Sequence, residues 1–524
     1  GTNFPRWIQR TFPKISMLAS SIFSFLYFLN LVQFRMKKSL CIFGFVTEKQ
    51  ILYLDLLQIN AILYLDLLQK YYLCSINIVV MFKRNAIDWL EKWKIKENRK
   101  PLIIRGARQV GKTSLVKEFA KQFDDFLYFN LELADDLALF SKEVSVTTLY
   151  EMMLVVRHKT KSDGNTLIFI DEIQNSSLAI KMLRYFYEEM SHLYVIAAGS
   201  LLETMINKEV SFPVGRVEYM ALRPCTFDEF LGAMGEDALR DMVRHFSVPE
   251  PLHERVMSLF NTYALVGGMP QAVSDYSSNR DIVALDSLFA SLLTSYIDDV
   301  EKYKTSDTSR NVLRYIISHG WNYASERITF ERFANSNYKS REVGDAFRTL
   351  QKTMLLELVY PTTETKLPIL PDLKKKPKLL WLDTGLLNYA VGIQSEIIGK
   401  ENINDAWRGK IAEHVVGQAI LGQSNNFLDV RSFWVREAKN SQAELDYLYS
   451  SRKYGLLPIE VKSGLNTHLK SLQLFMLQSP CSTAVRFWSN HYSVDEIALD
   501  NKSYKLHNMP YYYSGYLEEF MERL

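Results

Sequence analysis

The sequence is poor in cysteine and in net charge. Its 524 residues include four cysteines, which lie too far apart to form metal-ligand spacing: Cys41, Cys74, Cys225 and Cys481. They indicate a reducing, cytoplasmic setting. The formal net charge of +3 predicts nothing about partners, so any contact with nucleic acid has to come from local basic patches. With 48% hydrophobic residues the composition is that of a globular protein, and the length allows about three domains.

The first 80 residues lack a long uninterrupted apolar segment. The apolar stretch at residues 17–32 is broken by serines and an asparagine, is short for a membrane span and has no small-residue cleavage site. The octapeptide ILYLDLLQ at residues 51–58 recurs at residues 62–69, which indicates a local duplication and not a solenoid. We expect residues 1–80 to be a dispensable extension ahead of a native start at Met81. A membrane anchor is the alternative.

The most specific motif in the chain is a glycine-rich loop at residues 106–113. An apolar strand at residues 102–104 precedes it and a helical run at residues 114–120 follows it. The loop, GARQVGKT, fits G-x-x-x-x-G-K-[ST], and this order of strand, loop and helix is what a phosphate-binding loop requires. We predict that it binds ATP through these residues: Gly106, Ala107, Arg108, Gln109, Val110, Gly111, Lys112, Thr113 and Ser114.

The residue types in the loop explain its spacing. Gly106 and Gly111 let successive backbone N–H groups point into one concavity, and the positive end of the following helix adds to that field. Lys112 is predicted to reach the β and γ phosphates and to act in catalysis, and the Thr113 hydroxyl to bind Mg²⁺. The alternative is an ordinary Gly-Lys turn.

From residue 101 onward, strand and helix patterns alternate. Strands are predicted at residues 126–130, 166–172, 193–198 and 217–222, and helices at residues 148–158 and 178–190. This alternation predicts an α/β domain with a parallel sheet covered by helices on both faces.

Two acids end the predicted strand at residues 166–172. Asp171 is placed to hold Mg²⁺ and Glu172 to polarise an attacking water as general base. The alternative is a pair of solvated acids at a strand end. Ser200 ends the next strand, where it would sense the γ phosphate or simply occupy a tight turn. Arg216 would stabilise charge at its own site or at that of a neighbouring subunit, unless it is a surface arginine.

These motifs resemble the bacterial and archaeal ATPases of the AAA superfamily that carry a C-terminal domain of unknown function (DUF4143). The matching segments are GARQVGKT, LIFIDEIQ at residues 167–174, AAGS at residues 197–200 and LRPCTFDEFL at residues 222–231. The resemblance runs from about Met81 to the C-terminus. It implies an ATPase core at residues 81–232, a helical lid at 233–300, a winged helix at 301–400 and a nuclease-like α/β domain at 401–524.

The predicted lid and winged helix have weaker signals. The segment ALVGGMP at residues 264–270 marks a loop between helices. Residues 328–333 and 342–352 are predicted to form a helix-turn-helix, followed by two strands of a wing at residues 354–361 and 378–383. The basic tip at residues 374–378 would contact DNA phosphates, dock a protein, or be a solvated lysine run.

The last domain carries a second group of charged residues. A helix at residues 407–421 contains Glu413, a strand follows at residues 430–436, one at residues 443–449 contains Asp446, and its hairpin partner at residues 456–462 contains Glu460 and Lys462. This pattern resembles the PD-(D/E)XK nucleases, and the resemblance assigns Glu413 as the helix acid of that family.

The proposed roles follow from position and chemistry. Glu460 and Lys462 are two residues apart on one strand and so share a face. Asp446 and Glu460 are predicted to bind Mg²⁺, while Lys462 orients a hydroxide or steadies the transition state. The alternatives are alternating charge on a half-exposed hairpin, and a nuclease fold reused for binding without cleavage.

We therefore expect an ATP-binding, Mg²⁺-dependent ATPase whose nucleotide state controls a DNA-associated, nuclease-like domain. The rival is a nucleotide-switched protein-docking module with an inert nuclease fold. A third hypothesis, a membrane-tethered ATPase, depends wholly on residues 17–34. Self-association is left open by the sequence.

Overall fold

The computed structural model describes residues 82–199, 213, 215–303, 306–393, 405–436, 443–463, 469–499 and 502–524. The expectations for residues 1–80 and for Ser200 lie outside these residues. Among the helices described, none is long and apolar enough to cross a membrane.

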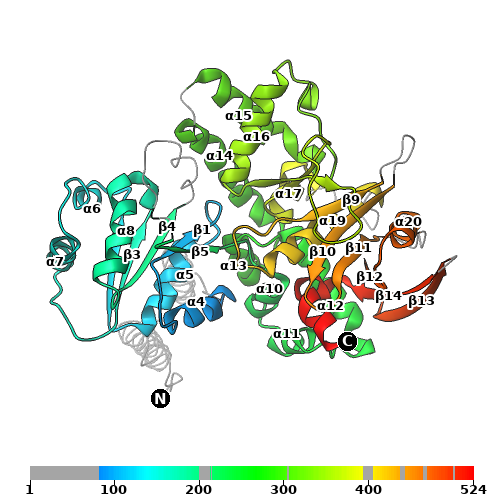
Figure 1. Cartoon of the computed structure of the whole chain (residues 1–524), viewed down its shortest axis with the longest axis horizontal. Coiled ribbons are helices and arrows are strands. Elements are labelled where there is room, and N and C mark those ends of the chain that lie inside the picture. Colours follow the sequence, from blue (N-terminus) through cyan, green and yellow to red (C-terminus); the bar gives the residue numbers. More distant parts are fainter. Residues whose placement is uncertain are drawn as a thin grey trace, which may run out of the picture. The chain divides into compact units, whose positions relative to one another are not determined.

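The first part of the described chain is built on a five-stranded sheet (Figure 1). The predicted glycine loop follows its strand β1. The strands are β1 (Leu102–Arg105), β2 (Asp125–Asn130), β3 (Thr166–Asp171), β4 (Tyr194–Gly199) and β5 (Glu218–Ala221). Their order is β2-β3-β4-β1-β5, and every pair is parallel. The predicted parallel α/β sheet is confirmed. Parallel strands end at a common edge, which places the loop after β1 near the acids that end β3.

Helices cover both faces of this sheet, whose central strands β1, β3 and β4 are mostly apolar and buried. The helices are α4 (Ala86–Lys94), α5 (Lys112–Phe119), α6 (Ala134–Ala138), α7 (Val146–Val156) and α8 (Ser177–Glu189). Leu102 and Ile104 belong to the core shared with α4 and α5, whereas Ile103 belongs to the core shared with α7 and α8. Successive strand residues thus point to opposite buried faces, as in sheets covered on both sides.

A run of helices follows the sheet. They are α10 (Phe227–Ala233), α11 (Asp237–Arg244), α12 (His253–Val266), α13 (Pro270–Asn279), α14 (Asp286–Tyr303), α15 (Asp307–His319) and α16 (Ser340–Lys352). Residues 237–299, where the sequence predicts helices, contain α11 to α13 and most of α14. The predicted loop at residues 264–270 joins α12 to α13, with Gly267 at φ 76° and Pro270 opening α13. Proline is tolerated there because the first turn of a helix has no use for its N–H.

One predicted helix is wrong. Residues 328–333 form no α-helix, since the Ile328 N–H donates to the Pro377 carbonyl at 2.8 Å and Arg327 forms a bridge with Lys378. Arg332, at φ 50°, takes a left-handed conformation that a helix excludes. Ile328 and Phe333 are both buried, so the apolar spacing was genuine, but the segment starts beside Pro377 and then turns instead of forming a helix. The two predicted wing strands do pair, as antiparallel β6 (Leu356–Val359) and β8 (Lys378–Trp381).

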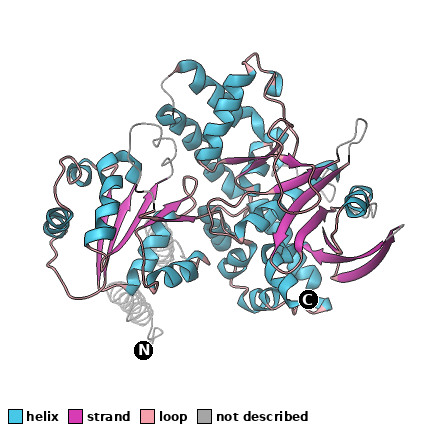
Figure 2. Cartoon of the chain, in the orientation of Figure 1, coloured by secondary structure: helices cyan, strands magenta, loops and turns pink. Residues whose placement is uncertain are grey.

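The C-terminal part is built on a seven-stranded mixed sheet (Figure 2). Its strands are β7 (Pro361–Thr362), β9 (Ser432–Val435), β10 (Glu444–Ser451), β11 (Gly455–Val461), β12 (Thr483–Trp488), β13 (Ser493–Leu499) and β14 (Lys502–Pro510), in the order β13-β14-β12-β11-β10-β9-β7. β9, β10 and β11 form an antiparallel meander, and β12 lies parallel to β11. The remaining helices are α17 (Thr384–Ala390), α19 (Asp405–Gly422), α20 (Lys470–Gln478) and α21 (Leu517–Arg523).

Candidate functional site

The glycine loop connects β1 to α5, and its two glycines are required by its geometry. Gly111 is the N-cap of α5 at φ 92°, a left-handed conformation that favours glycine. At Gly106 a Cβ atom would lie 2.5 Å from the Leu222 carbonyl oxygen, because the chain leaving β5 packs directly against the loop. Of the other predicted loop residues, Ala107 and Val110 are buried, while Gln109 and Ser114 are exposed.

Lys112 lies buried inside the loop. Its ammonium donates to the carbonyl oxygens of Gly106 and Ala107, both at 2.9 Å. Burial lowers the pKa of Lys112 to about 8, and the nearby acids Glu172 and Asp171 offset only part of that effect. Both of these hydrogen bonds go to neutral oxygens, so a phosphate would supply the negative charge that this buried ammonium lacks.

Thr113 and Asp171 meet as the sequence predicts. The Thr113 hydroxyl, at the start of α5, donates to Asp171 Oδ2 at 2.6 Å, and Asp171 is buried at the end of β3. Hydroxyl and carboxylate oxygens are the ligands that Mg²⁺ prefers, so the pair fits a magnesium site. The sequence did not single out Tyr128 on β2, whose hydroxyl donates to the same carboxylate at 3.4 Å.

Glu172 lies beside this pair in a strained conformation. Its φ is 51°, which is rare for a residue with a side chain and costs about 1 kcal/mol. The Gln174 amide donates to its carboxylate. Burial raises the pKa of Glu172 above its usual value, an environment suited to a carboxylate that accepts a proton. The structure therefore brings Lys112, Thr113, Asp171 and Glu172 into one site.

Helix α14, in the segment predicted to form the lid, reaches the loop. Arg108 forms an ion pair with Asp299, with Nη1 at 2.6 and 2.8 Å from the two carboxylate oxygens. The Tyr296 hydroxyl, one turn earlier on the same helix, donates to the Arg108 carbonyl at 2.9 Å. A residue predicted to contact phosphate thus also holds α14. Neither Tyr296 nor Asp299 has a motif that would have revealed this role.

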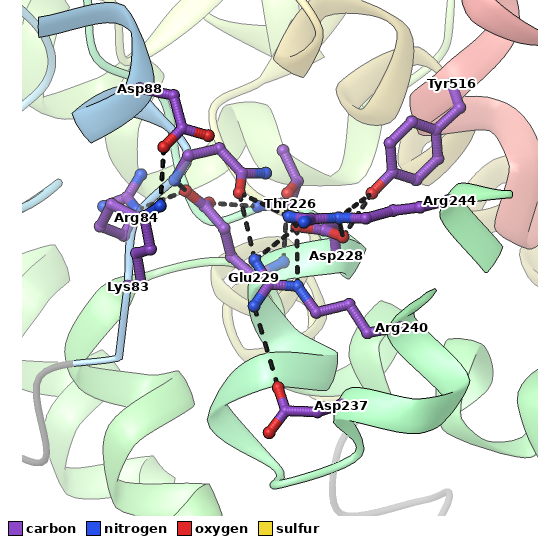
Figure 3. Close-up of polar contacts among 11 residues, drawn as sticks. Lys83, Arg84, Asp88, Thr226, Asp228, Glu229, Asp237, Arg240, Arg244 and Tyr516 are labelled. Carbon is purple, nitrogen blue, oxygen red and sulfur yellow. Dashed lines mark hydrogen bonds and ion pairs between the residues drawn. The ribbon is translucent and has the colours of Figure 1, made fainter. Parts of the chain in front are cut away.

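Arg84, whose side chain is 11% exposed, contacts the loop on the side of α10, where Figure 3 shows its ion pair with Glu229. Arg84 donates to the Val110 carbonyl at 3.0 Å, to the Arg223 carbonyl at 2.8 Å, and to Glu229 Oε1 at 3.0 Å. Glu229 also closes the capping box of α10 with Thr226. The segment LRPCTFDEFL, which carried part of the family resemblance, therefore connects the glycine loop to α10 through Arg84.

The contacts of this segment continue to the end of the chain through Asp228. This carboxylate accepts hydrogen bonds from Arg240 and Arg244 of α11 and from the Tyr516 hydroxyl (Figure 3). Burial would raise the pKa of Asp228, but the hydrogen bonds from Arg244 and Arg240 outweigh it and hold the pKa well below its usual range.

Arg216 stands apart from this site in the described structure. Its guanidinium pairs with Glu188 of α8 at 2.8 Å, and it is substantially exposed. This placement is that of a surface arginine. Its use by a neighbouring subunit stays a prediction, and Ser200 lies outside the described residues.

A second charged site forms at the meeting of α19, β10 and β11. Continuing the pairing of Tyr447 with Ile459 places Asp446 directly opposite Glu460. The Lys462 ammonium lies 2.5 Å from Glu460 Oε1, and Asp446 Oδ2 accepts from the Val461 N–H at 2.7 Å. Glu413 of α19 interacts electrostatically with both acids. The structure thus brings together Glu413, Asp446, Glu460 and Lys462.

Burial dominates the electrostatics of this second site. Burial raises the pKa of Glu413 and that of Glu460, and in each case the Asp446 carboxylate raises it further. Within the described residues, no group of three or more His, Cys, Asp and Glu side chains is arranged to hold a metal ion. A divalent cation at Asp446 and Glu460 therefore stays a prediction.

The sequence missed a lysine that enters this site from β8. Lys378 is 1% exposed, and its ammonium lies 2.6 Å from Glu413 Oε1 and 2.8 Å from Glu444 Oε1. Lys378 was predicted to belong to a basic surface tip, and that part of the prediction is wrong. Burial lowers the pKa of Lys378, but the carboxylates of Glu413 and Glu444 outweigh it, so the ammonium keeps its charge. Lys374 and Lys376 of the same run are exposed, as expected.

Three family models match successive parts of the chain. A model of an AAA domain matches residues 98–231, and models of two domains of unknown function match residues 257–397 (DUF8612) and 408–498 (DUF4143). The chain carries an AAA P-loop ATPase domain and a C-terminal DUF4143 domain. The AAA domain contains the whole of the glycine loop together with Asp171 and Glu172. The DUF4143 domain contains Glu413, Asp446, Glu460 and Lys462, but not Lys378.

Several solved structures are similar to the chain. The Walker-type ATPase paby2304 of Pyrococcus abyssi is 14% identical with a TM-score of 0.37, covering 59% of this chain and 96% of that one. The Aeropyrum pernix ORC1 protein, solved in complex with DNA, is 12% identical with a TM-score of 0.28, covering 62% and 95%. The Thermotoga maritima RuvB Holliday junction branch migration motor is 13% identical with a TM-score of 0.24, covering 56% and 93%. No curated protein matches the chain.

Proposed function

We propose that the AAA domain binds and hydrolyses ATP with Mg²⁺. The observation that carries this proposal is the convergence of Lys112, the Thr113–Asp171 pair and Glu172 at one end of the sheet. Lys112 would hold phosphate oxygens, and Thr113 and Asp171 would hold the magnesium ion, which neutralises developing charge on the phosphates. Glu172 would accept a proton from the attacking water, and its buried environment suits that task.

ATP binding and turnover by purified variants test this proposal. Lys112→Ala should weaken ATP binding by about 100-fold, because a charge-assisted contact to phosphate is lost. Glu172→Gln should retain binding and lower turnover by about 100-fold or more. Lys121→Ala, which removes an exposed lysine in an ion pair with Glu118, is the matched control and should change neither value. Normal ATP binding by Lys112→Ala would contradict the proposal.

We further propose that the nucleotide state is transmitted to the DUF4143 domain. The support is direct bonding between the two: the Ala221 N–H at the end of β5 donates to the Asn425 carbonyl at 2.7 Å, and Arg223 donates to the carbonyls of Ser424 and Asn426. Leu222, which lies between Ala221 and Arg223 in the sequence, packs against Gly106 of the loop. A shift of the loop would therefore act on residues that contact the end of α19.

A DNA-directed activity of the DUF4143 domain is one candidate for what is controlled. Its support is the grouping of Glu413, Asp446, Glu460 and Lys462 on a helix and a strand meander, and the exposed Lys374 and Lys376 of the predicted winged helix. Incubation with plasmid, Mg²⁺ and ATP tests it. Cleavage or retention of plasmid that is lost in Asp446→Asn would support it, and neither across a range of salt concentrations would contradict it.

Protein docking by an inert nuclease-like fold is the second candidate. The observation that favours it is the pairing of Lys378 with Glu413 and Glu444, which engages one acid of the predicted set, Glu413. If Asp446→Ala and Lys462→Ala leave every cellular activity of the protein intact, docking is favoured. Loss of that activity in both variants would favour chemistry at the acids.

A further inference from the structure

We propose that Lys378 is the resident cation of the carboxylate cluster formed by Glu413, Glu444, Asp446 and Glu460, and that it stands where a divalent metal would otherwise be needed. The cluster is therefore complete without a metal. The inference goes beyond the proposed ATPase activity and is independent of it, since none of these residues lies in the AAA domain.

The geometry of the ammonium carries this inference. Lys378 opens β8, which pairs with β6 and is not part of the seven-stranded sheet, yet its side chain reaches α19 and β10. Its ammonium lies 2.6 Å from Glu413, 2.8 Å from Glu444 and 4.6 Å from the centre of the Phe433 ring. An ammonium has three donors, and here two carboxylates and an aromatic face surround it. The ammonium is therefore surrounded by groups that favour a cation.

The burial of Lys378 shows that this pairing is strong. A buried lysine without partners would shed its proton, because desolvation disfavours the charged form. Burial indeed lowers the pKa of Lys378, but the carboxylates of Glu413 and Glu444 outweigh it and hold the pKa well above the usual value. The side chain therefore carries its charge while 1% exposed.

The other acids of the cluster are also occupied. Asp446 accepts the Val461 N–H, and Glu460 pairs with Lys462. Within the cluster, Glu460 Oε2 is the buried oxygen that lacks a hydrogen-bond partner in the described part of the chain. Mg²⁺ is usually held by one or two carboxylates together with waters, and here Glu413 and Glu444 already bind the Lys378 ammonium. A metal that used Glu413 as a ligand would have to displace Lys378 from it.

Manganese binding by nucleotide-free protein tests the inference. The measurement is the electron paramagnetic resonance signal of free Mn²⁺ during titration, together with the unfolding temperature. All variants carry Asp171→Asn, which silences the magnesium site proposed for the AAA domain. The parent should bind no Mn²⁺ at the cluster and show no thermal shift. Lys378→Met should unfold about 10 °C lower, bind one Mn²⁺, and recover its stability when Mn²⁺ is added.

Two further variants serve as controls. Lys378→Met combined with Glu413→Gln removes the cation and one of its partners, and it should bind no Mn²⁺. Lys378→Arg keeps the charge and should behave like the parent. If Lys378→Met does not fold without metal, its refolding from urea with and without Mn²⁺ tests the same inference. The metal should restore the folded fraction.

Two results would overturn the inference. One is Mn²⁺ binding by the parent that disappears when Asp446→Asn is added. The other is a failure of Mn²⁺ to bind or restore Lys378→Met. ATP turnover, measured with Asp171 intact, should be unchanged in Lys378→Arg, so a failure here is separable from a failure of the proposed ATPase activity.

Discussion

At the scale of single residues, burial decides the chemistry of the candidate ATPase site more than any ion pair does. Lys112 is surrounded by its own loop, and Glu172 is lifted out of water at the end of β3. Both charges are therefore costly in the folded protein, which is typical of groups that await a ligand or a proton. Asp171 differs, since the Thr113 hydroxyl bonds it directly.

The lowered pKa of Lys112 predicts how ATP affinity depends on pH. In free protein the ammonium loses its proton around pH 8, whereas bound phosphate favours the charged form. Affinity should therefore be level below about pH 8 and fall by up to about tenfold per pH unit above it. Isothermal titration between about pH 7 and pH 9.5 measures this slope. Lys112→Arg, which stays charged, should give a flat profile over the same range.

At the scale of elements, two arginines hold the glycine loop between α14 and the core. Arg108 binds α14, and Arg84 contacts the loop through Val110. Each of these connects segments that are far apart in the sequence. The loop is thus fixed by tertiary contacts and not by its own glycines alone.

The contact between the loop and α14 should be measurable by a double-mutant cycle. Arg108→Met and Asp299→Asn each remove one partner of the ion pair, and their combination should cost less than the sum of the two. Because Arg108 is partly exposed, we expect a coupling of about 1 kcal/mol from urea unfolding. ATP should stabilise each variant less than the parent. A coupling near zero, with ATP stabilising the variants as much as the parent, would contradict the inference that α14 holds the glycine loop.

Removing Arg84 should destabilise the protein more than removing the ion pair between Arg108 and Asp299. Arg84→Met leaves Glu229 buried at 3% exposure without this cation, and we expect a loss of about 3 kcal/mol in the free energy of unfolding. Affinity for ATP should fall as well, since Val110 loses its support. Arg184→Met removes a surface pair with Glu188 and is the matched control, expected to cost less than about 0.5 kcal/mol. Equal effects of the two substitutions would refute this role of Arg84.

At the scale of the described chain, three glycines allow close packing where the loop at residues 264–270, α17 and α19 meet. A Cβ on Gly267 would lie 2.2 Å from Asp383 Oδ1, one on Gly268 would lie 2.2 Å from the Cys225 carbonyl, and one on Gly385 would lie 2.1 Å from the Val266 carbonyl. Asp383, fully buried, accepts from the Gly268 N–H at 2.5 Å and from the Gln418 amide at 3.2 Å. Backbones approach here more closely than any side chain permits.

This junction predicts a sharp contrast between two glycine substitutions. Gly385→Ala should lower the free energy of unfolding by about 3 kcal/mol, because its methyl group meets backbone that cannot move aside. Gly515→Ala, where a Cβ would meet nothing within 4 Å, should be close to neutral. Urea unfolding followed by far-ultraviolet circular dichroism compares them. Similar stabilities would show that the junction adapts.

The sequence by itself determined the parallel sheet, the glycine loop and the acids that end β3, because these depend on local pattern: an apolar strand, a fixed glycine spacing and carboxylates at a strand end. It also placed Glu413, Asp446 and Glu460 on the right elements, and Lys462 comes directly after β11. It failed at residues 328–333, where backbone hydrogen bonds to a distant strand replaced a helix.

Only the tertiary structure decided which cations meet which anions. Lys378 looked like the end of a solvated lysine run, and Arg84 and Asp299 had no motif at all. Their roles arise from chain segments that are distant in sequence and packed together, so that a charge is either buried against its partner or left in water. Whether a charge is buried or left in water depends on desolvation, which a local sequence pattern does not show.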